Sequence, residues 1–454
     1  MRAPAERTLL VGVELKAELN ARSRTSRLAM DERSDPEEPL QELAALAESA
    51  GAHVVGRITQ SRPSLNAATL LGSGKVEELR ARIEAEDVEA VVFDQELTPT
   101  QLRNLQRRLQ VKILDRTQLI LDIFAARART SEGKLQVELA QLNYLLPRLT
   151  GRGTQMSRLG GGIGTRGPGE TQLETDRRRI GSRIAKLKSE IERVRATRGV
   201  QRSQRQAVPL STVSLVGYTN AGKSTLFNRL TGAGVLADAR LFATLDPIVR
   251  QIRLPSRRQV LISDTVGFIR NLPTTLVDAF RATLEEVTAA ALLLHVVDVT
   301  SPVAAEQTAH VLKVLAEIRA DTTPQILVFN KSDRLPEGER DQDLAAHTHR
   351  LLGESARLNE TAAALVSGQS GEGVPELLKL IDKRLVQDPV ARQRFRLPLA
   401  EGRALHLLHD RAAIVSKRYE DTYCEVVADA PQSIRDKLAE FAIPQSDARA
   451  TAKL

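Results

Sequence analysis

Hydrophobic residues in the first 130 positions alternate between two kinds of spacing. Short apolar, β-rich runs predict four strands, at residues 8–13, 53–58, 88–93 and 111–114. Between these runs apolar residues recur every three or four positions, as at Leu40, Leu43 and Leu46, which predicts helices. Because strands that alternate with helices form parallel sheets, we expect residues 1–130 to be an N-terminal parallel α/β domain.

Two longer apolar stripes follow between residues 131 and 205. The first consists of Leu135, Leu139, Leu142 and Leu146, and the second of Ile180, Ile184, Leu187, Ile191 and Val194. Their steps of four and three residues are heptad spacing, which fits two helices paired as an antiparallel hairpin as well as two ordinary core faces. The stretch 148–170 between them is too glycine-rich to pack a core, and we expect it to project as a mobile tip loop.

The rest of the chain divides into a linker, a large domain and a small one. Polar residues at 199–210 are typical of a linker, and the large domain is expected at 211–388. A basic junction at 390–396 precedes the predicted small α+β domain at 394–454, whose last ten residues are expected to be disordered. The predicted fold class is therefore α/β, with the N-terminal sheet and hairpin, a doubly wound central sheet and the small C-terminal unit.

A glycine-rich turn at 217–225 connects an apolar strand pattern to a helical one and fits G-x-x-x-x-G-K-[ST]. Its members are Gly217, Tyr218, Thr219, Asn220, Ala221, Gly222, Lys223, Ser224 and Thr225. Glycines let successive N–H groups point inward, and the following helix N-terminus adds partial positive charge. Lys223 can reach the β- and γ-phosphates and Ser224 can ligate Mg²⁺, so the motif predicts a nucleotide-binding P-loop.

Three further motifs follow apolar strand patterns in the order expected of a GTPase. They consist of Asp264, Thr265, Val266 and Gly267; Asn330, Lys331, Ser332 and Asp333; and Ser367, Gly368 and Gln369. Asp264 can hold the Mg²⁺ shell through water, and the Gly267 amide can meet the γ-phosphate. Asp333 can accept two N–H groups of guanine, a pattern that adenine lacks. An ordinary serine–glycine turn explains 367–369 equally well on local grounds.

A fourth segment precedes the Asp264 motif and consists of Phe242, Ala243, Thr244, Leu245 and Asp246. Thr244 can supply a second hydroxyl to Mg²⁺ when the γ-phosphate is present, although it also fits an ordinary turn. Lys223, Thr244 and Gly267 are the residues expected to act in catalysis, and Ser224 and Thr244 those expected to bind the metal.

The residue after the Asp264 motif is Phe268, where many GTPases have a water-orienting glutamine. Phenylalanine has neither a donor nor an acceptor for water, so we expect slow intrinsic hydrolysis. Stimulation can come from a partner or from K⁺, because Asn220 stands where potassium-dependent GTPases carry a potassium ligand. A simple turn residue is the alternative for Asn220.

The whole chain resembles the HflX family of bacterial GTPases. The resemblance rests on the motifs above and on blocks outside them, at 115–124, 127–129, 135–142, 160–164 and 166–176. It implies a GTPase of the large (50S) ribosomal subunit that splits or rescues stalled ribosomes, with ATP use in some members. The sequence departs from the family at Gly368, where alanine is usual, and little loss is expected. A weak phosphate-binding signal at 72–75 fits either a second nucleotide or a plain helix start.

Composition and net charge bear on the binding partner and on the cellular compartment. The 454 residues carry a net charge of +8, which favours an anionic partner, and a single cysteine, Cys424, which excludes internal disulfides. With no signal peptide or long apolar run, we expect a cytoplasmic monomer that binds GTP and GDP. Arg152, Arg158 and Arg166 of the tip loop favour ribosomal RNA as partner over the alternatives, a regulatory protein adaptor or an RNA-processing GTPase.

Overall fold

The computed structural model describes most of the chain in two compact units. The described residues are 5–15, 38–149, 172–206, 210–233, 241–242, 244–270, 281–336, 344, 347–348, 351, 362–385 and 389–443. The first unit holds the described residues up to Arg195 and the short segment around Thr244, and the second holds the remainder. Among the described residues, no helix combines the length and the apolar character needed to cross a membrane.

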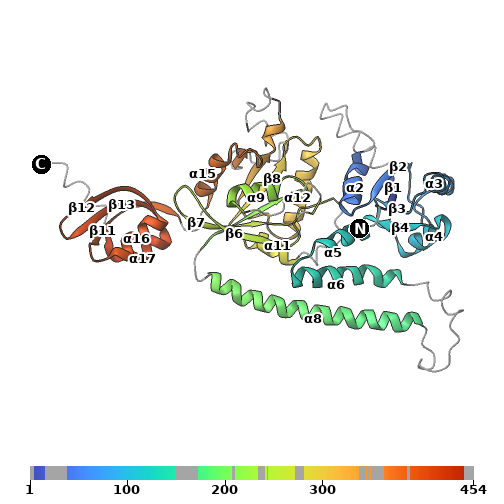
Figure 1. Ribbon diagram of the computed structural model, residues 1–454, viewed down its shortest axis with the longest axis horizontal. Helices are drawn as coiled ribbons and strands as arrows, with labels where there is room; N and C mark the ends of the chain where they lie inside the picture. Colours follow the sequence, from blue (N-terminus) through green and yellow to red (C-terminus); the bar gives the residue numbers. More distant parts are fainter. Residues whose placement is uncertain are drawn as a thin grey trace. The chain divides into compact units, whose positions relative to one another are not determined.

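The first unit contains the predicted parallel sheet, in the strand order β2-β1-β3-β4 (Figure 1). Its strands are β1 (Arg7–Leu15), β2 (His53–Arg62), β3 (Ala90–Phe93) and β4 (Lys112–Asp115). Its helices are α2 (Glu38–Ser49), α3 (Ser73–Ala85), α4 (Pro99–Leu109) and α5 (Arg116–Arg127). Leu9, Val11 and Phe93 are fully buried in its core, as the apolar runs predict. At the weak 72–75 signal, Gly72 precedes α3 and the Lys75 ammonium pairs with Glu78 at 2.7 Å.

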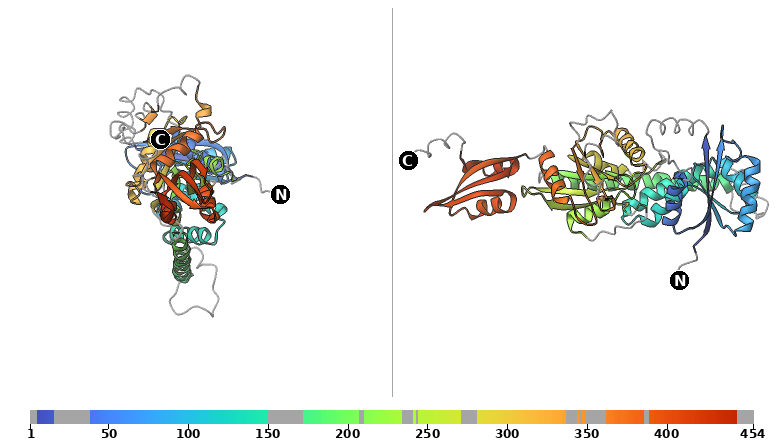
Figure 2. Two further views of the ribbon diagram at one scale, coloured as in Figure 1. Left: turned by 90° about the vertical axis from the view of Figure 1, so that its left-hand side faces the viewer. Right: turned by 90° about the horizontal axis from the view of Figure 1, so that it is seen from above.

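The predicted hairpin consists of α6 (Ser131–Arg148) and α8 (Gln172–Gln206), which lie side by side in Figures 1 and 2. The Arg183 guanidinium bonds both carboxylate oxygens of Glu138 at 2.7 Å and ties the two helices together. Ile184, Leu187 and Ile191 are buried as expected, whereas the predicted leucine stripe of α6 is only half-buried. The reason is that α6 also packs on α5, so its most buried face is the one that carries Val137, Ala140 and Tyr144.

Two expectations about this hairpin need correction. Helix α8 continues to Gln206, through most of the segment interpreted as a linker. Arg148 belongs to the end of α6 and not to a projecting loop, because its guanidinium bonds the Leu97 carbonyl at 2.9 Å and lies 3.1 Å from the Glu96 carboxylate. The rest of the predicted tip loop, with Arg152, Arg158 and Arg166, lies outside the described residues.

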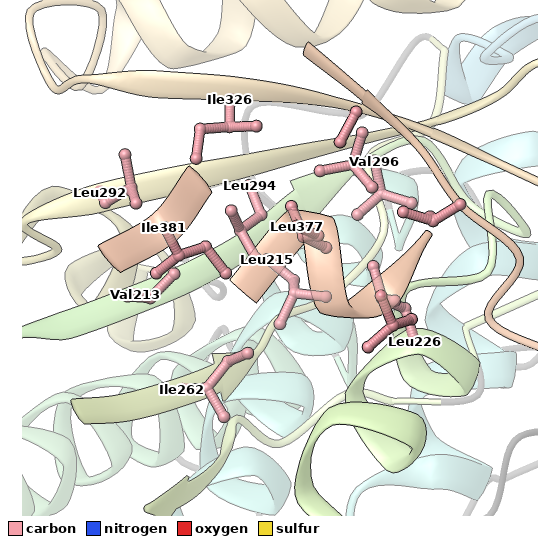
Figure 3. Packing of buried hydrophobic residues seen from close by; sticks show 14 of the residues in the cluster. Val213, Leu215, Leu226, Ile262, Leu292, Leu294, Val296, Ile326, Leu377 and Ile381 are labelled. Atoms are coloured by element: carbon pink, nitrogen blue, oxygen red, sulfur yellow. The ribbon is translucent and has the colours of Figure 1, made fainter. Parts of the chain in front are cut away.

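The second unit contains a six-stranded sheet in the order β10-β9-β8-β5-β7-β6, parallel except for β6. Its strands are β5 (Thr212–Gly217), β6 (Ile248–Arg253), β7 (Gln259–Asp264), β8 (Leu292–Asp298), β9 (Gln325–Asn330) and β10 (Ala362–Leu365). Its helices are α9 (Lys223–Thr231), α11 (Arg281–Thr288), α12 (Ala304–Glu317) and α15 (Val374–Arg384). Leu226 of α9 and Leu377 of α15 pack on one face of this sheet (Figure 3). This sheet brings the carboxyl ends of β5, β7, β8 and β9 to one edge, where the predicted motifs begin.

A small antiparallel sheet completes the second unit, in the order β12-β13-β11-β14. Its elements are β11 (Val390–Pro398), α16 (Gly402–Arg411), β12 (Ala413–Tyr419), β13 (Tyr423–Pro431), α17 (Gln432–Lys437) and β14 (Ala442–Ile443). The basic segment expected as a junction is thus a strand inside this sheet, between β13 and β14. Its alternation of arginine with apolar residues is the two-residue period of a half-buried strand.

Candidate functional site

The P-loop turn between β5 and α9 is possible only with glycine at two positions. Gly217 has φ 150°, and a Cβ there would lie 2.2 Å from the Val296 carbonyl oxygen. Gly222 has φ 91°, and its Cβ would lie 2.2 Å from the Asn330 amide nitrogen. Both distances are far below van der Waals contact, so any larger residue would displace the neighbouring strand end. The two glycines therefore let the loop close against β8 and the Asn330 motif.

Lys223 opens α9 and folds back into this loop. Its buried ammonium donates to the carbonyl oxygens of Gly217 at 3.1 Å and Tyr218 at 2.7 Å. Burial lowers the pKa of Lys223 to about 8, an effect that nearby Asp264 opposes and Lys331 reinforces. The side chain therefore holds a positive charge inside the loop, where phosphate oxygens can replace the two carbonyls as acceptors.

Ser224 and Asp264 meet at the end of β7. The Ser224 hydroxyl donates to Asp264 Oδ2 at 2.7 Å, and Asp264 is fully buried. Hydroxyl and carboxylate oxygens are ligands that suit Mg²⁺, which keeps several waters and binds substrate phosphates in addition. The described residues contain no group of three or more His, Cys, Asp or Glu side chains that could hold a metal alone. The donor set thus fits a magnesium ion that arrives with a nucleotide.

The segment after Asp264 is bonded to the P-loop backbone. The Thr219 amide donates to the Phe268 carbonyl at 2.7 Å, and the Phe268 amide donates to the Gly217 carbonyl at 3.1 Å. A Cβ on Gly267 would lie 2.9 Å from the Lys223 nitrogen. Gly267 is therefore held close to Lys223, the group expected to bind the γ-phosphate. Phe268 is buried, so its side chain offers nothing to orient water.

Two side chains that sequence reasoning missed hold the next residues of this segment. The Tyr218 hydroxyl accepts the Arg270 amide at 2.8 Å, and His310 Nε2 bonds the Ile269 carbonyl at 3.0 Å. Tyr218 lies within the P-loop motif, but the motif says nothing of its hydroxyl. His310 lies on α12, and no local pattern in the sequence connects it with residue 269.

The two motifs expected to bind guanine come together at the ends of β9 and β10. Asn330 donates to the Ala221 carbonyl and accepts the Gly368 amide, both at 2.9 Å. The Ser367 hydroxyl donates to Asp333 Oδ1 at 2.6 Å. Asn330 thereby holds the P-loop and the Gly368 loop together. The hydrogen bond from Ser367 orients the Asp333 carboxylate. A carboxylate positioned in this way can accept the paired donors of a guanine edge.

Other contacts around this base site refine the sequence picture. The Lys331 ammonium pairs with Asp298 at 2.6 Å, a partner that was missed although Asp298 ends an apolar strand pattern. A Cβ on Gly368 would lie 3.2 Å from the Leu226 amide nitrogen, so glycine lets this loop approach α9 closely. The Arg229 guanidinium bonds the carbonyls of Gly368 and Gln369 and holds the same loop.

The segment around Thr244 belongs to the first unit. The Phe242 ring packs edge-on against Phe124 of α5 with 4.6 Å between centroids, and the Leu241 amide donates to Ser49 at 3.0 Å. Thr244 is buried, and Ala243 lies outside the described residues. The metal-binding role of Thr244 and the nucleotide contacts of residues 242–246 remain predictions.

Two residues of the second unit bear on catalysis and on stability. Asn220 is exposed and has φ 62°, a conformation that asparagine tolerates better than most residues, and this fits both a turn and an ion ligand. His295 is buried in β8, and among the described residues its Nδ1 has no hydrogen-bond partner. Burial lowers the pKa of His295 to about 4, with a smaller contribution from Lys223.

Comparisons with known proteins agree with this site. Residues 37–125 match the family model described as GTP-binding GTPase N-terminal, 127–205 the GTP-binding GTPase middle region, and 212–331 the 50S ribosome-binding GTPase. GTPase HflX of Caldanaerobacter subterraneus subsp. tengcongensis is 45% identical over 409 residues, which cover 90% of this chain and 91% of that protein. GTPase HflX of Escherichia coli K12 is 45% identical over 388 residues, covering 85% of this chain and 87% of that protein.

Solved structures include a GTP-binding protein from Sulfolobus solfataricus in complex with GDP. It is 24% identical, with a TM-score of 0.44, and the match covers 84% of this chain and 99% of that one. At these values the structural likeness carries no argument, whereas the sequence relatives span nearly the whole chain. Because these relatives are 45% identical over most of their length and of this one, the chain belongs to the HflX family of GTPases.

Proposed function

We propose that this GTPase binds the 50S ribosomal subunit in its GTP state, and that GTP hydrolysis releases it in a cycle of ribosome splitting or rescue. The observation that carries the proposal is the pair of backbone hydrogen bonds that join Phe268 to Gly217 and Thr219 and so keep Gly267 close to Lys223. A γ-phosphate must separate Gly267 from Lys223, so GTP and GDP select different conformations of residues 267–270. The match of 212–331 to a 50S ribosome-binding GTPase supports the choice of partner.

The reaction is attack of water on the γ-phosphorus, with cleavage of the bond to the β-phosphate oxygen, which yields GDP and phosphate. Lys223 and the P-loop amides would bind the phosphate oxygens and stabilise the charge that develops on them. Ser224 and Thr244 would hold Mg²⁺, which neutralises the phosphate oxygens when bound, and Asp264 would orient its water shell. The Gly267 amide would bind the γ-phosphate after its release from the P-loop.

Phe268 leaves the attacking water without a side chain to orient it in the isolated protein. The ribosome is the first proposed source of stimulation, because a partner can order residues 267–270 or add a polar group. Potassium held by Asn220 is the second. Hydrolysis in potassium and sodium buffers, for the natural protein and Asn220→Ala, tests the second source: a potassium advantage that Asn220→Ala removes supports it, and equal rates remove it.

Co-sedimentation with 30S, 50S and 70S particles tests the main proposal. We expect the protein to pellet with 50S in a non-hydrolysable GTP analogue and to stay in the supernatant with GDP. Loss of 70S particles under the same conditions, in favour of separated subunits, would support splitting. Binding that ignores the nucleotide, or that goes to no ribosomal particle, would favour the adaptor or RNA-processing alternatives.

The tip-loop arginines provide a second test of ribosome binding. Replacing Arg152, Arg158 and Arg166 with alanine should weaken 50S binding and flatten its salt dependence, because each phosphate contact releases counterions. The matched control replaces Arg80, Arg107 and Arg108, three exposed arginines of α3 and α4, with alanine. Equal behaviour of the two triple variants would remove the loop from RNA binding.

A further inference from the structure

The C-terminal sheet has one covered face and one open face. Its strands and helices follow in the order β11, α16, β12, β13, α17, β14, with the sheet order β12-β13-β11-β14, which is the split βαβ arrangement of ferredoxin-like domains. Phe395 and Val426 point into a core completed by Leu408 of α16 and Ile434 of α17, so both helices cover the same face. None of the described elements of this domain covers the other face of its sheet (Figure 2).

The open face carries arginine at every second position of the central strand β11. Arg392, Arg394 and Arg396 are all exposed there, whereas Phe395 and Leu397, on the opposite face of the strand, are fully buried or nearly so. Residues two apart on a strand lie roughly 6.6 Å from one another, so the three guanidinium groups form a row. The row is part of the fold, because its spacing follows from the alternation that builds the core beneath it.

Neighbouring strands extend this row across the sheet. Arg396 lies opposite Glu425 of β13 and forms an ion pair with it, and Arg418 of the edge strand β12 lies opposite the same Glu425 but forms its ion pair with Glu420. Arg392 lies opposite Asp429 of β13, and the two side chains form a bidentate ion pair at 2.8 and 3.0 Å. These pairs are largely exposed to solvent and hence weak, so a polyanion can compete for the arginines.

Arg394 in the middle of the row differs from its neighbours. Its cross-strand neighbours are Val427 of β13, which lies beside Ser416 of β12, and Ile443 of β14. Within the described part of the chain, no acidic side chain is paired with Arg394, although every other arginine of this face has one. The centre of the face therefore carries an exposed arginine that no acidic side chain of the described residues neutralises.

One aromatic ring lies on the same face. The Arg396 guanidinium stacks over the Tyr423 ring of β13 at 4.8 Å, at the end of the arginine row. Flat guanidinium and phenol groups on the two central strands of an open sheet are the groups on which unpaired RNA bases stack, while phosphates bind the neighbouring arginines. We propose that this open face, centred on Arg394 and Tyr423, binds single-stranded RNA.

RNA fits this surface better than an acidic protein does. The exposed part of the face carries few large apolar groups that a protein interface would bury, since Val427 and Ile443, the apolar neighbours of Arg394, are both half-buried. The proposal adds a second RNA contact to the proposed ribosome binding, in a domain that the three family matches, which end at residue 331, do not include. It does not depend on that function, because free RNA can be tested without ribosomes.

The test measures binding of a short fluorescein-labelled oligouridylate to the full-length GDP-bound protein across a salt series. Arg394→Ala should weaken binding about fivefold at low salt and reduce the slope of log K against log salt by about 0.7, the value for one phosphate contact on a single strand. Tyr423→Leu should lower affinity with the slope unchanged. The matched control is Arg403→Ala, which removes the same charge from the exposed, helical side of the same domain.

Two outcomes would overturn the proposal. One is an equal effect of Arg394→Ala and Arg403→Ala, which would mean that RNA binding depends on the net charge of the domain and not on this face. The other is displacement of the RNA by polyglutamate at the same charge concentration, which would assign the face to acidic proteins. Repeating the series with the tip-loop triple variant separates the two RNA contacts, since the Arg394→Ala effect should persist there. If the protein fails to co-sediment with 50S particles, the proposed ribosome binding is wrong, but the oligouridylate measurement still decides whether this face binds RNA.

Discussion

Both parallel sheets of the molecule carry a fully buried aspartate at the carboxyl end of a strand, Asp115 in β4 and Asp264 in β7. Asp115 accepts the Leu97 amide at 3.0 Å and the Gln118 amide at 2.9 Å, and Arg148 lies 3.5 Å from it. Burial raises the pKa of Asp115, while these hydrogen bonds oppose the rise. Asp264 instead accepts a hydrogen bond from the Ser224 hydroxyl. A metal ion can take the place of this hydroxyl next to the carboxylate.

The positively charged groups near the two aspartates also differ. In the first sheet the buried Arg116 guanidinium lies 2.7 Å from the Asp94 carboxylate and 3.0 Å from the Glu42 carboxylate. The positive charge at the carboxyl ends of these strands is therefore an arginine of the protein itself. In the second sheet Gly217 and Gly222 shape the edge, and the cation is Lys223, held by carbonyl groups. Buried charge alone therefore does not identify a site: we interpret the N-terminal cluster as part of the fold and propose that the glycine-bounded edge binds the nucleotide.

The largest effect should come from removing Arg116. Arg116→Met leaves Asp94 and Glu42 close together without their cation, and breaking a buried ion pair costs about 3–5 kcal/mol. Urea unfolding of the N-terminal unit measures the loss. The control is Arg80→Met, since Arg80 forms only an exposed pair with Glu84 and its loss should change stability by less than about 0.5 kcal/mol. A small effect of Arg116→Met would mean that this edge is not structural.

Lys223→Ala should have the opposite profile, with activity lost and the fold retained. Removing a cation that stabilises developing phosphate charge should reduce GTP hydrolysis at least about a hundredfold. Phosphate release under single-turnover conditions measures this, and Lys379→Ala on the exposed side of α15 is the matched control. Near-native turnover in Lys223→Ala would show that hydrolysis occurs elsewhere.

His295 should make the stability of the six-stranded sheet depend on pH. Its pKa is about 4 when folded and about 6.5 when unfolded, so the unfolded state binds the proton first as the pH falls. The neutral side chain thus contributes stability above about pH 6.5 that is lost as the pH falls through about 4, on the order of 3 kcal/mol in total. His295→Leu should remove this difference in chemical unfolding curves, whereas replacing the exposed His53 should not.

Asp333→Asn should change base preference and leave the phosphate site intact. The hydrogen bonds of a charged acceptor contribute roughly 1.5–3 kcal/mol, so GTP affinity should fall about ten- to a hundredfold. Xanthosine triphosphate should gain affinity, because the amide can donate to the carbonyl that replaces the guanine amino group. Competition binding with Asp321→Asn as an exposed control measures both, and unchanged GTP affinity would remove Asp333 from base recognition.

How far the sequence predicts this structure depends on whether a feature is local. The four N-terminal strands, the P-loop and the buried stripe of α8 follow from spacing within a few residues. Gly222 against Asn330, Arg148 against Glu96 and His310 against Ile269 depend on residues far apart in the sequence, and no periodicity reveals them. The junction at 390–396 was misinterpreted because arginines concealed the alternating pattern of β11, whose buried residues are only Phe395 and Leu397.

Binding of a fluorescent GTP analogue in Mg²⁺, measured side by side on the natural protein, Lys223→Ala and Arg116→Met, tests the distinction between the two sheets most directly. Circular dichroism first establishes a temperature at which all three are folded. We predict that Arg116→Met binds the analogue with natural affinity despite its lower stability, and that Lys223→Ala binds it far more weakly despite its intact fold. Natural affinity in Lys223→Ala together with lost binding in Arg116→Met would contradict the account and place the nucleotide at the N-terminal sheet.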